Sequence, residues 1–129
     1  MKILICKGGS ESCDKMISVM KDVGECYISE DGEDALFRAS SNVYDLVVAD
    51  IKLTKMNCIE FITQLRKRSN VPLIVVSDMD NSELAADILE LGADEYLHAP
   101  INIRETKARI DSVLRRANNL FKNSVYELK

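Results

Sequence analysis

Short apolar runs and stretches of helical periodicity alternate five times along this chain of 129 residues. The apolar runs cover residues 3–6, 26–28, 44–49, 73–76 and 96–97. Each is followed by a segment whose apolar residues recur every three to four positions, as on an amphipathic helix. Because the connections are short, successive parallel strands need right-handed crossovers. The pattern predicts an α/β fold with a five-stranded parallel sheet wrapped by five helices.

Capping residues and a change in polarity place the ends of the predicted helices. Ser10 is expected to cap the first helix, and Asn81 is expected to cap the fourth. The fifth helix should continue past Arg116. Residues 1–116 therefore form the predicted domain. The more polar residues 117–129 are predicted to be the end of that helix and a linker.

The charge balance and the hydropathy pattern exclude several classes of protein. A formal net charge of −4 and a pI of about 5.0 argue against a domain that itself binds nucleic acid. No apolar run approaches the roughly 20 residues that span a bilayer. The N-terminal MKILIC also lacks the pattern of a signal peptide. We therefore expect a cytoplasmic protein without membrane contact.

Four cysteines and a single histidine, His98, are scattered without the spacing of a zinc site. This distribution predicts reduced and mostly buried thiols. The alternative is a redox sensor built on Cys58 or Cys6, for which Lys7 beside Cys6 could favour the thiolate.

Polar residues follow the predicted strands at the points where the strands end. Asp50 ends the third run, residues 7–9 follow the first, and Ser77 and His98 follow the fourth and fifth. The carboxyl ends of parallel strands meet at one edge of a sheet, where such folds bind their ligands. The sequence therefore predicts a functional edge around Asp50.

Residues 1–116 resemble a response-regulator receiver domain, which has the flavodoxin-like (CheY-like) form of this fold. The resemblance is carried by Asp50 after the third strand and by Pro72-Leu73-Ile74 before Ser77. It is carried above all by LGADEYLHAPINIRETKARIDSVLRR, residues 91–116. This last stretch is similar to the OmpR/PhoB branch, whose members join a receiver to a winged-helix DNA-binding domain.

The resemblance implies a phosphoryl acceptor at Asp50. In the family, two acids after the first strand help this aspartate to hold Mg²⁺, and a hydroxyl and a lysine bind the phosphoryl oxygens. This chain keeps Asp50 and the hydroxyl of Ser77. Its departures from the family pattern are Lys7 and Gly8 for the two acids, Ala99 for the lysine, Asp78 for a small residue and Cys58 for a glycine.

These departures predict a degenerate pocket. A single carboxylate cannot hold Mg²⁺ firmly, so we expect weak or absent magnesium binding, no cofactor and no enzymatic activity. Asp50 is expected to be vestigial or structural rather than a working acceptor. Two positions of Lys7 remain open: its ammonium contacts Asp50 and offsets that charge, or it is solvated on a loop.

The resemblance also implies a two-fold dimer face built from the fourth helix, fifth strand and fifth helix. The residues that match its charged positions are Asp94, Glu95, Glu105, Arg109 and Arg116. Candidates for its apolar patch, or equally for ordinary core, are Ala85, Leu89, Ala108 and Leu114. The fourth helix carries Ala85, Ala86 and Asp87 where basic residues are common. Tyr96 matches the family's aromatic switch residue, whose inward rotation accompanies movement of the hydroxyl residue towards the phosphoryl group.

The sequence therefore predicts the receiver domain of an atypical, orphan two-component transcriptional regulator. It would act without phosphorylation, form a homodimer, and bind promoter DNA through a linked C-terminal domain. A histidine kinase is not expected as a partner. Two alternatives remain: slow phosphorylation of Asp50 with the help of Ser77, and a protein-interaction module without DNA-binding output.

Overall fold

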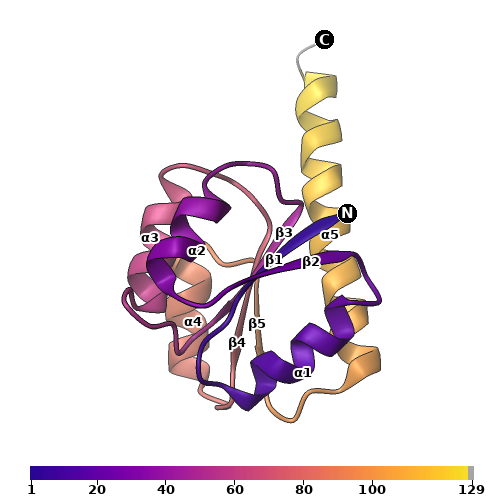
Figure 1. The fold of residues 1–129 in the computed structure, drawn as a ribbon. Helices are drawn as coiled ribbons and strands as arrows, with labels where there is room; N and C mark the ends of the chain where they lie inside the picture. The colour runs from indigo at the N-terminus through magenta and orange to yellow at the C-terminus, as the bar shows by residue number, and fades with distance from the viewer. Residues whose placement is uncertain (128–129) are drawn as a thin grey trace.

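All five predicted strands form, and every neighbouring pair in the sheet is parallel (Figure 1). The computed structural model describes the backbone of residues 1–127 and the side chains of residues 1–118. The strands pair in the order β2-β1-β3-β4-β5. Their bounds are β1 Lys2–Cys6, β2 Glu25–Ser29, β3 Leu46–Asp50, β4 Leu73–Ser77 and β5 Glu95–His98.

Five helices cover the two faces of this sheet, as the alternating pattern predicted. Their bounds are α1 Glu11–Met20, α2 Gly32–Ala39, α3 Cys58–Arg66, α4 Ser82–Leu91 and α5 Ile103–Glu127. Helices α1 and α5 pack on one face, and α2, α3 and α4 pack on the other (Figure 1). The α/β fold with a five-stranded parallel sheet is therefore confirmed.

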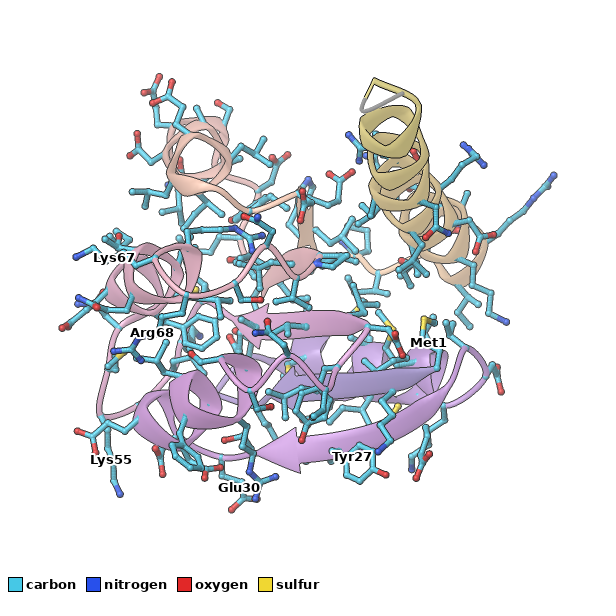
Figure 2. The ribbon with its side chains drawn as sticks, turned by 90° about the horizontal axis from the view of Figure 1, so that it is seen from above. Met1, Tyr27, Glu30, Lys55, Lys67 and Arg68 are labelled. Carbon is cyan, nitrogen blue, oxygen red and sulfur yellow. The ribbon has the colours of Figure 1, made fainter. Side chains whose placement is uncertain are left out.

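The two faces explain why the strands are apolar without alternation. In β1, Ile3 and Ile5 pack towards α1 and α5, whereas Leu4 and Cys6 pack towards the other three helices. Every residue of β3 and of β4 is buried. Strand β2 lies at the edge of the sheet, where Tyr27 is partly exposed (Figure 2).

The strand order places β1 and β3 side by side, with their connections leaving in opposite directions. The chain passes from β1 outward to β2, and from β3 outward to β4 and β5. This is the topological switch point at which α/β sheets open a crevice beyond the carboxyl ends of their strands. Cys6 pairs with Ala49, and Asp50 follows at once. Asp50 and the loop after β1 therefore meet at this point, as the sequence predicted.

The C-terminal part of the chain differs from the prediction. Helix α5 continues to Glu127, so most of residues 117–129 is helix rather than linker. The end of this helix extends past the amino-terminal edge of the sheet, away from Asp50 (Figure 1). Residues 128–129 lie outside the described part of the chain. No helix within residues 1–127 is both long and apolar enough to cross a membrane.

Candidate functional site

Asp50 is completely buried at the end of β3 and accepts four hydrogen bonds. Its Oδ1 accepts from Ser10 Oγ at 2.6 Å and from the backbone N–H of Lys52 at 2.9 Å. Its Oδ2 accepts from the backbone N–H groups of Gly8 at 3.1 Å and Ser10 at 2.9 Å. An ionised carboxylate offers about four lone-pair sites. The hydrogen-bonding capacity of Asp50 is therefore filled by the chain itself.

The loop after β3 lies directly against the loop after β1. A Cβ atom added to Gly8 would lie 2.4 Å from the carbonyl oxygen of Lys52 and 3.0 Å from Cγ of Asp50. Both neighbours are fixed, the first because it is backbone and the second because of its hydrogen bonds. Gly8 is thus needed for a close approach of two backbones. A side chain at position 8, where the resemblance implies an acid, would therefore collide with the Lys52 peptide.

The side chain of Lys7 turns away from Asp50. Its Nζ lies 3.5 Å from Oδ1 of Asp14 on α1, in a pair whose side chains are 39% and 63% exposed. Its backbone N–H donates to the carbonyl of Ser29, which continues the pairing of β1 with β2. Of the two open positions for Lys7, the contact with Asp50 is therefore not the one observed. Backbone N–H groups and a hydroxyl surround the carboxylate in its place.

Ser10 has a different role from the one predicted. Its backbone is extended at the N-cap position of α1, but its side chain makes no capping hydrogen bond. The Ser10 hydroxyl donates to Asp50 instead, and Ser10 is itself buried. Sequence reasoning missed this contact because a serine before a helix satisfies the local capping pattern equally well.

The N-terminus of α1 is capped by Asp78, which follows β4. Its Oδ1 accepts from the backbone N–H of Ser12 at 2.9 Å, and its Oδ2 accepts from that of Glu11 at 3.2 Å. The ammonium of Lys52 lies 3.6 Å from Oδ2. The hydrogen bonds from Ser12, with smaller contributions from Glu11 and Lys52, lower the pKa of Asp78 below its usual value. Asp78 is thus an ionised capping residue supplied from a distant loop.

Ser77 and Tyr96 are both buried and both bonded to Met79. Ser77 Oγ accepts from the backbone N–H of Met79 at 3.0 Å. The hydroxyl of Tyr96 donates to the carbonyl oxygen of Met79 at 2.9 Å, and the residue is 7% exposed. Ala99 donates its backbone N–H to the carbonyl of Ser77. The aromatic side chain is therefore held inward, against the loop between β4 and α4.

The residues at this edge do not fit a magnesium ion. Mg²⁺ requires several oxygen ligands at short distance, normally with at least one carboxylate. The oxygens of Asp50 are engaged by four donors, and those of Asp78 face the N-terminus of α1. In the described part of the chain, no three His, Cys, Asp or Glu side chains form a metal-binding group.

The buried thiols are in environments that suppress reactivity. Burial, assisted by the negative charge of Asp50, raises the pKa of Cys13 to about 12 and that of Cys58 to about 12. Burial also raises the pKa of Cys6 well above its usual value. Reactive cysteines require a thiolate. These positions argue against the redox-sensor alternative for Cys6 and Cys58.

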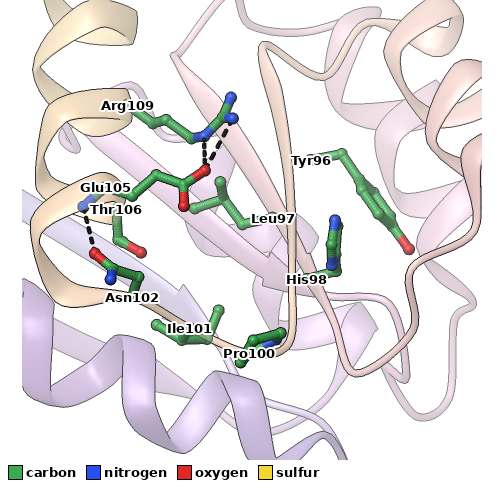
Figure 3. A pocket seen from close by; sticks show the side chains of 9 residues that line it. All are labelled: Tyr96, Leu97, His98, Pro100, Ile101, Asn102, Glu105, Thr106 and Arg109. Carbon is green, nitrogen blue, oxygen red and sulfur yellow. Dashed lines mark hydrogen bonds and ion pairs between the residues drawn. The ribbon is translucent and has the colours of Figure 1, made fainter.

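Three of the predicted dimer-face charges pair within the monomer. Arg109 Nη2 lies 3.0 Å from Oε1 of Glu105, one turn away on α5, and its Nη1 lies 3.5 Å from Oε2 of Glu95 on β5. A hollow of about 230 Å³ lies beside this pair, between β5 and the start of α5 (Figure 3). Arg116 makes one weak hydrogen bond within the described side chains, from Nε to the carbonyl of Ser112 at 3.4 Å.

The fourth predicted charge, Asp94, is drawn into a separate network around Arg66. The Arg66 guanidinium donates to the carbonyl oxygens of Gly92 at 2.8 Å and Val71 at 2.7 Å. Asp94 pairs with it at 3.2 Å and also accepts the backbone N–H of Leu73. Burial lowers the pKa of Arg66, and the charge of Asp94 opposes this shift. Arg66 thus joins the end of α3 to both strands that follow, a role that sequence analysis missed.

The predicted apolar patch divides into exposed and packed residues. Leu89 on α4 is 43% exposed, and Ala108 on α5 is also exposed. Ala85 and Leu114 are partly buried and pack against the two cores. Leu89 and Ala108 therefore remain available for a contact, and Ala85 and Leu114 contribute mainly to the interior.

Comparisons with known proteins show which family the chain belongs to. The sequence profile of the response regulator receiver domain matches residues 10–111. The transcriptional regulatory protein CiaR of Streptococcus pneumoniae is 28% identical over 126 residues, which cover 97% of this chain and 56% of CiaR. The response regulator ArlR of Staphylococcus aureus is 35% identical over 86 residues, 67% of this chain and 39% of ArlR. The chain thus spans about half or less of the length of these relatives.

Solved structures of response regulators have the same fold as this chain. A two-component response regulator from Clostridium difficile superposes with a TM-score of 0.79 at 26% identity, covering 92% of this chain and 98% of that one. A CheY-like receiver domain protein from Methanospirillum hungatei superposes with a TM-score of 0.77 at 25% identity, covering 92% and 96%. With the receiver profile matching most of its length, the chain belongs to the family of response regulator receiver domains, the signal-receiving modules of two-component systems.

Proposed function

We propose that this chain is the receiver domain of an OmpR/PhoB-type transcriptional regulator that adopts its active form without phosphorylation of Asp50. The observation that carries the proposal is the filled carboxylate: Asp50 is fully buried and accepts two hydrogen bonds on each oxygen. Such a residue serves as an anchor for the loops after β1 and β3. It is poorly placed to act as a nucleophile.

The chemistry of phosphoryl transfer explains why this arrangement argues against acceptance. The attacking oxygen needs a free lone pair in line with phosphorus, and cations must neutralise the charge that develops on the equatorial oxygens. The ammonium of Lys7 is turned towards Asp14, that of Lys52 is paired with Asp78, and Ala99 supplies no charge. Freeing one oxygen of Asp50 breaks two charge-assisted bonds, each worth about 1.5 to 3 kcal/mol.

The transcriptional part of the proposal rests on the relatives. The protein from Streptococcus pneumoniae is named as a transcriptional regulator, and this chain matches 56% of its length. We infer that a linked C-terminal domain, of winged-helix type, binds promoter DNA, and that the regulator works in the cytoplasm without a cognate histidine kinase. The acidic balance of this chain suits a regulatory rather than a DNA-contacting part.

The proposed homodimer uses the face formed by α4, β5 and α5. Leu89 and Ala108 supply exposed apolar surface, and the Glu105–Arg109 pair is exposed enough to exchange partners across a two-fold axis. Asp94 is already held by Arg66, so we expect the ion pairs of the dimer to come mainly from β5 and α5.

Phosphorylation and assembly can be tested together. The protein is incubated with a small acyl phosphate and Mg²⁺, and separately with beryllofluoride, followed by intact-mass measurement and sedimentation. We expect no phosphoryl adduct and no change in the association constant with either reagent. An adduct that disappears in Asp50→Ala would favour the weak-acceptor alternative. A wild-type protein that stays monomeric at high concentration would rule out the preformed dimer.

A further inference from the structure

The loop between β4 and α4 is fastened to α1 by the side chain of Asp78. Its two oxygens accept the backbone N–H groups of Ser12 and Glu11, at 2.9 and 3.2 Å, and Lys52 places an ammonium 3.6 Å from one of them. The N-terminus of a helix carries a partial positive charge, so the cap is favourable for an anion. The N-terminus of α1 and the ammonium of Lys52 therefore both bind the carboxylate of Asp78 and fix this loop.

Met79, the residue after Asp78, accepts the hydrogen bond of the Tyr96 hydroxyl. The carbonyl oxygen of Met79 accepts from the Tyr96 hydroxyl at 2.9 Å, and the Met79 N–H donates to Ser77 Oγ at 3.0 Å. The hydroxyl end of Tyr96 points away from the Glu105–Arg109 pair and out of the hollow that the ring borders (Figure 3). Asp78 and the acceptor of the Tyr96 hydroxyl are therefore adjacent residues of one loop, so a displacement of Asp78 would also move the Met79 carbonyl.

We propose that Asp78 is a built-in anionic latch that holds Tyr96 inward, and so sets the shape of the α4–β5–α5 face without any modification. The inference rests on the proposed function and names the device that maintains it. The resemblance implies that, in the family, the hydroxyl residue after β4 moves towards a phosphoryl group on the aspartate. Here the loop itself carries the anion, and the positive partners lie on α1 and on the loop after β3.

The charge on Asp78 distinguishes a latch from a simple helix cap. A cap of α1 alone would change the stability of the helix but would leave the environment of Tyr96 unaltered. A latch predicts that Tyr96 responds when Asp78 is changed. The neighbouring acid Asp80 offers a matched control, because it lies on the same loop, its side chain is 79% exposed, and its one ion-pair contact among the described side chains is with His98, at 3.5 Å.

The test uses the protein labelled with 3-fluorotyrosine, with the Tyr96 fluorine resonance assigned by its loss in Tyr96→Phe. Asp78→Ala is expected to move this resonance towards that of free fluorotyrosine. It is also expected to weaken self-association about tenfold, the equivalent of about 1.4 kcal/mol for loss of the Tyr96–Met79 hydrogen bond. Asp78→Asn, which keeps an acceptor but not the charge, should give an intermediate shift. Asp80→Ala should keep the Tyr96–Met79 bond and shift the resonance much less than Asp78→Ala, because it acts only through His98, whose ring centroid lies 6.3 Å from that of Tyr96.

One further variant keeps the outcome decisive. If Asp78→Ala does not fold, Lys52→Met removes the cation from an exposed position and should shift the same resonance in the same direction by a smaller amount. A folded Asp78→Ala whose Tyr96 resonance matches the wild type overturns the latch. The Tyr96 signal is read within one protomer, so it decides the latch even if sedimentation or mass measurement rejects the proposed function.

Discussion

Exchange of Asp50 for asparagine should change the stability of this domain in the opposite direction from the change expected in a working receiver site. Where three carboxylates converge, neutralising one relieves repulsion and leaves the domain unchanged or more stable. Here the four partners of Asp50 all donate, so an amide group must point its own N–H bonds at some of them. We expect Asp50→Asn to be destabilising.

The size of the effect follows from the two ways in which the amide can be placed. With its nitrogen at the Oδ2 position, it opposes the backbone N–H groups of Gly8 and Ser10. With its nitrogen at the Oδ1 position, the Ser10 hydroxyl can rotate to accept, and only the N–H of Lys52 loses its acceptor. One buried donor without an acceptor costs about 1 to 3 kcal/mol. Loss of the negative charge also weakens the remaining hydrogen bonds to this side chain. The lower cost of burying a neutral amide partly offsets this effect. The net loss is about 2 to 4 kcal/mol, or about 8 to 16 °C in Tm for a domain of this size.

Urea denaturation followed by far-UV circular dichroism measures this loss, and an unchanged m-value identifies it as a change in stability. Asp14→Asn is the matched control. Asp14 pairs with Lys7 at the surface, where such pairs contribute about 0 to 1 kcal/mol. If Asp50→Asn is as stable as the wild type, or more stable, the four hydrogen bonds do not hold the carboxylate and the proposed anchor is wrong.

Three further substitutions test other parts of the structure. Gly8→Ala should destabilise the domain by about 1 to 3 kcal/mol through overpacking against Lys52, whereas Gly9→Ala, whose Cβ would meet only a flexible side chain at 3.7 Å, should be nearly neutral in the same denaturation assay. Arg66→Met should cost about 2 to 4 kcal/mol because two partly buried carbonyl oxygens lose a charged donor. Arg68→Met, at the surface, should fall within about 0.5 kcal/mol of the wild type. Asp78→Asn should have a lower free energy of unfolding than the wild type above the usual aspartate pKa of 3.8. Because the folded-state pKa of Asp78 is lowered, this difference should shrink as the pH falls through that lowered value. A difference that persists at the acid end would contradict an ionised cap.

The fold could be predicted because each element carries its own local signal. Strands β3 and β4 are apolar on both faces, and Asn81 caps α4 through its bond to the N–H of Leu84, as predicted from sequence. The location of the site followed from topology alone, because parallel strands end at a common edge. Continuation of α5 past Arg116 was predicted, but its end at Glu127 was not, since the polarity of residues 117–127 resembles that of a linker as much as that of a solvated helix.

The contacts within the site were less predictable because they join residues far apart in the chain. Ser10 could cap α1 or bond to Asp50, and the choice depends on a partner 40 positions away. Asp78 caps a helix that begins 67 positions before it. Lys7 had an even choice between Asp50 and solvent. The Lys7 ammonium does not contact Asp50 because backbone N–H groups donate to the carboxylate at 2.9 to 3.1 Å. These groups need no entropy loss from ordering a long side chain.

The departures of this pocket from the family pattern depend on one another. Removal of the two acids leaves one buried carboxylate whose charge must be balanced, and the balance comes from N–H donors on two loops that approach closely. That approach is possible only with glycine at position 8, because a side chain there would meet the Lys52 carbonyl at 2.4 Å. An acid reintroduced at Gly8 would therefore collide with backbone before it could bind a metal, and it would add a second negative charge beside Asp50. An acid at position 8 should thus destabilise the domain, and only a coordinated displacement of the Lys52 loop could open the site to a metal.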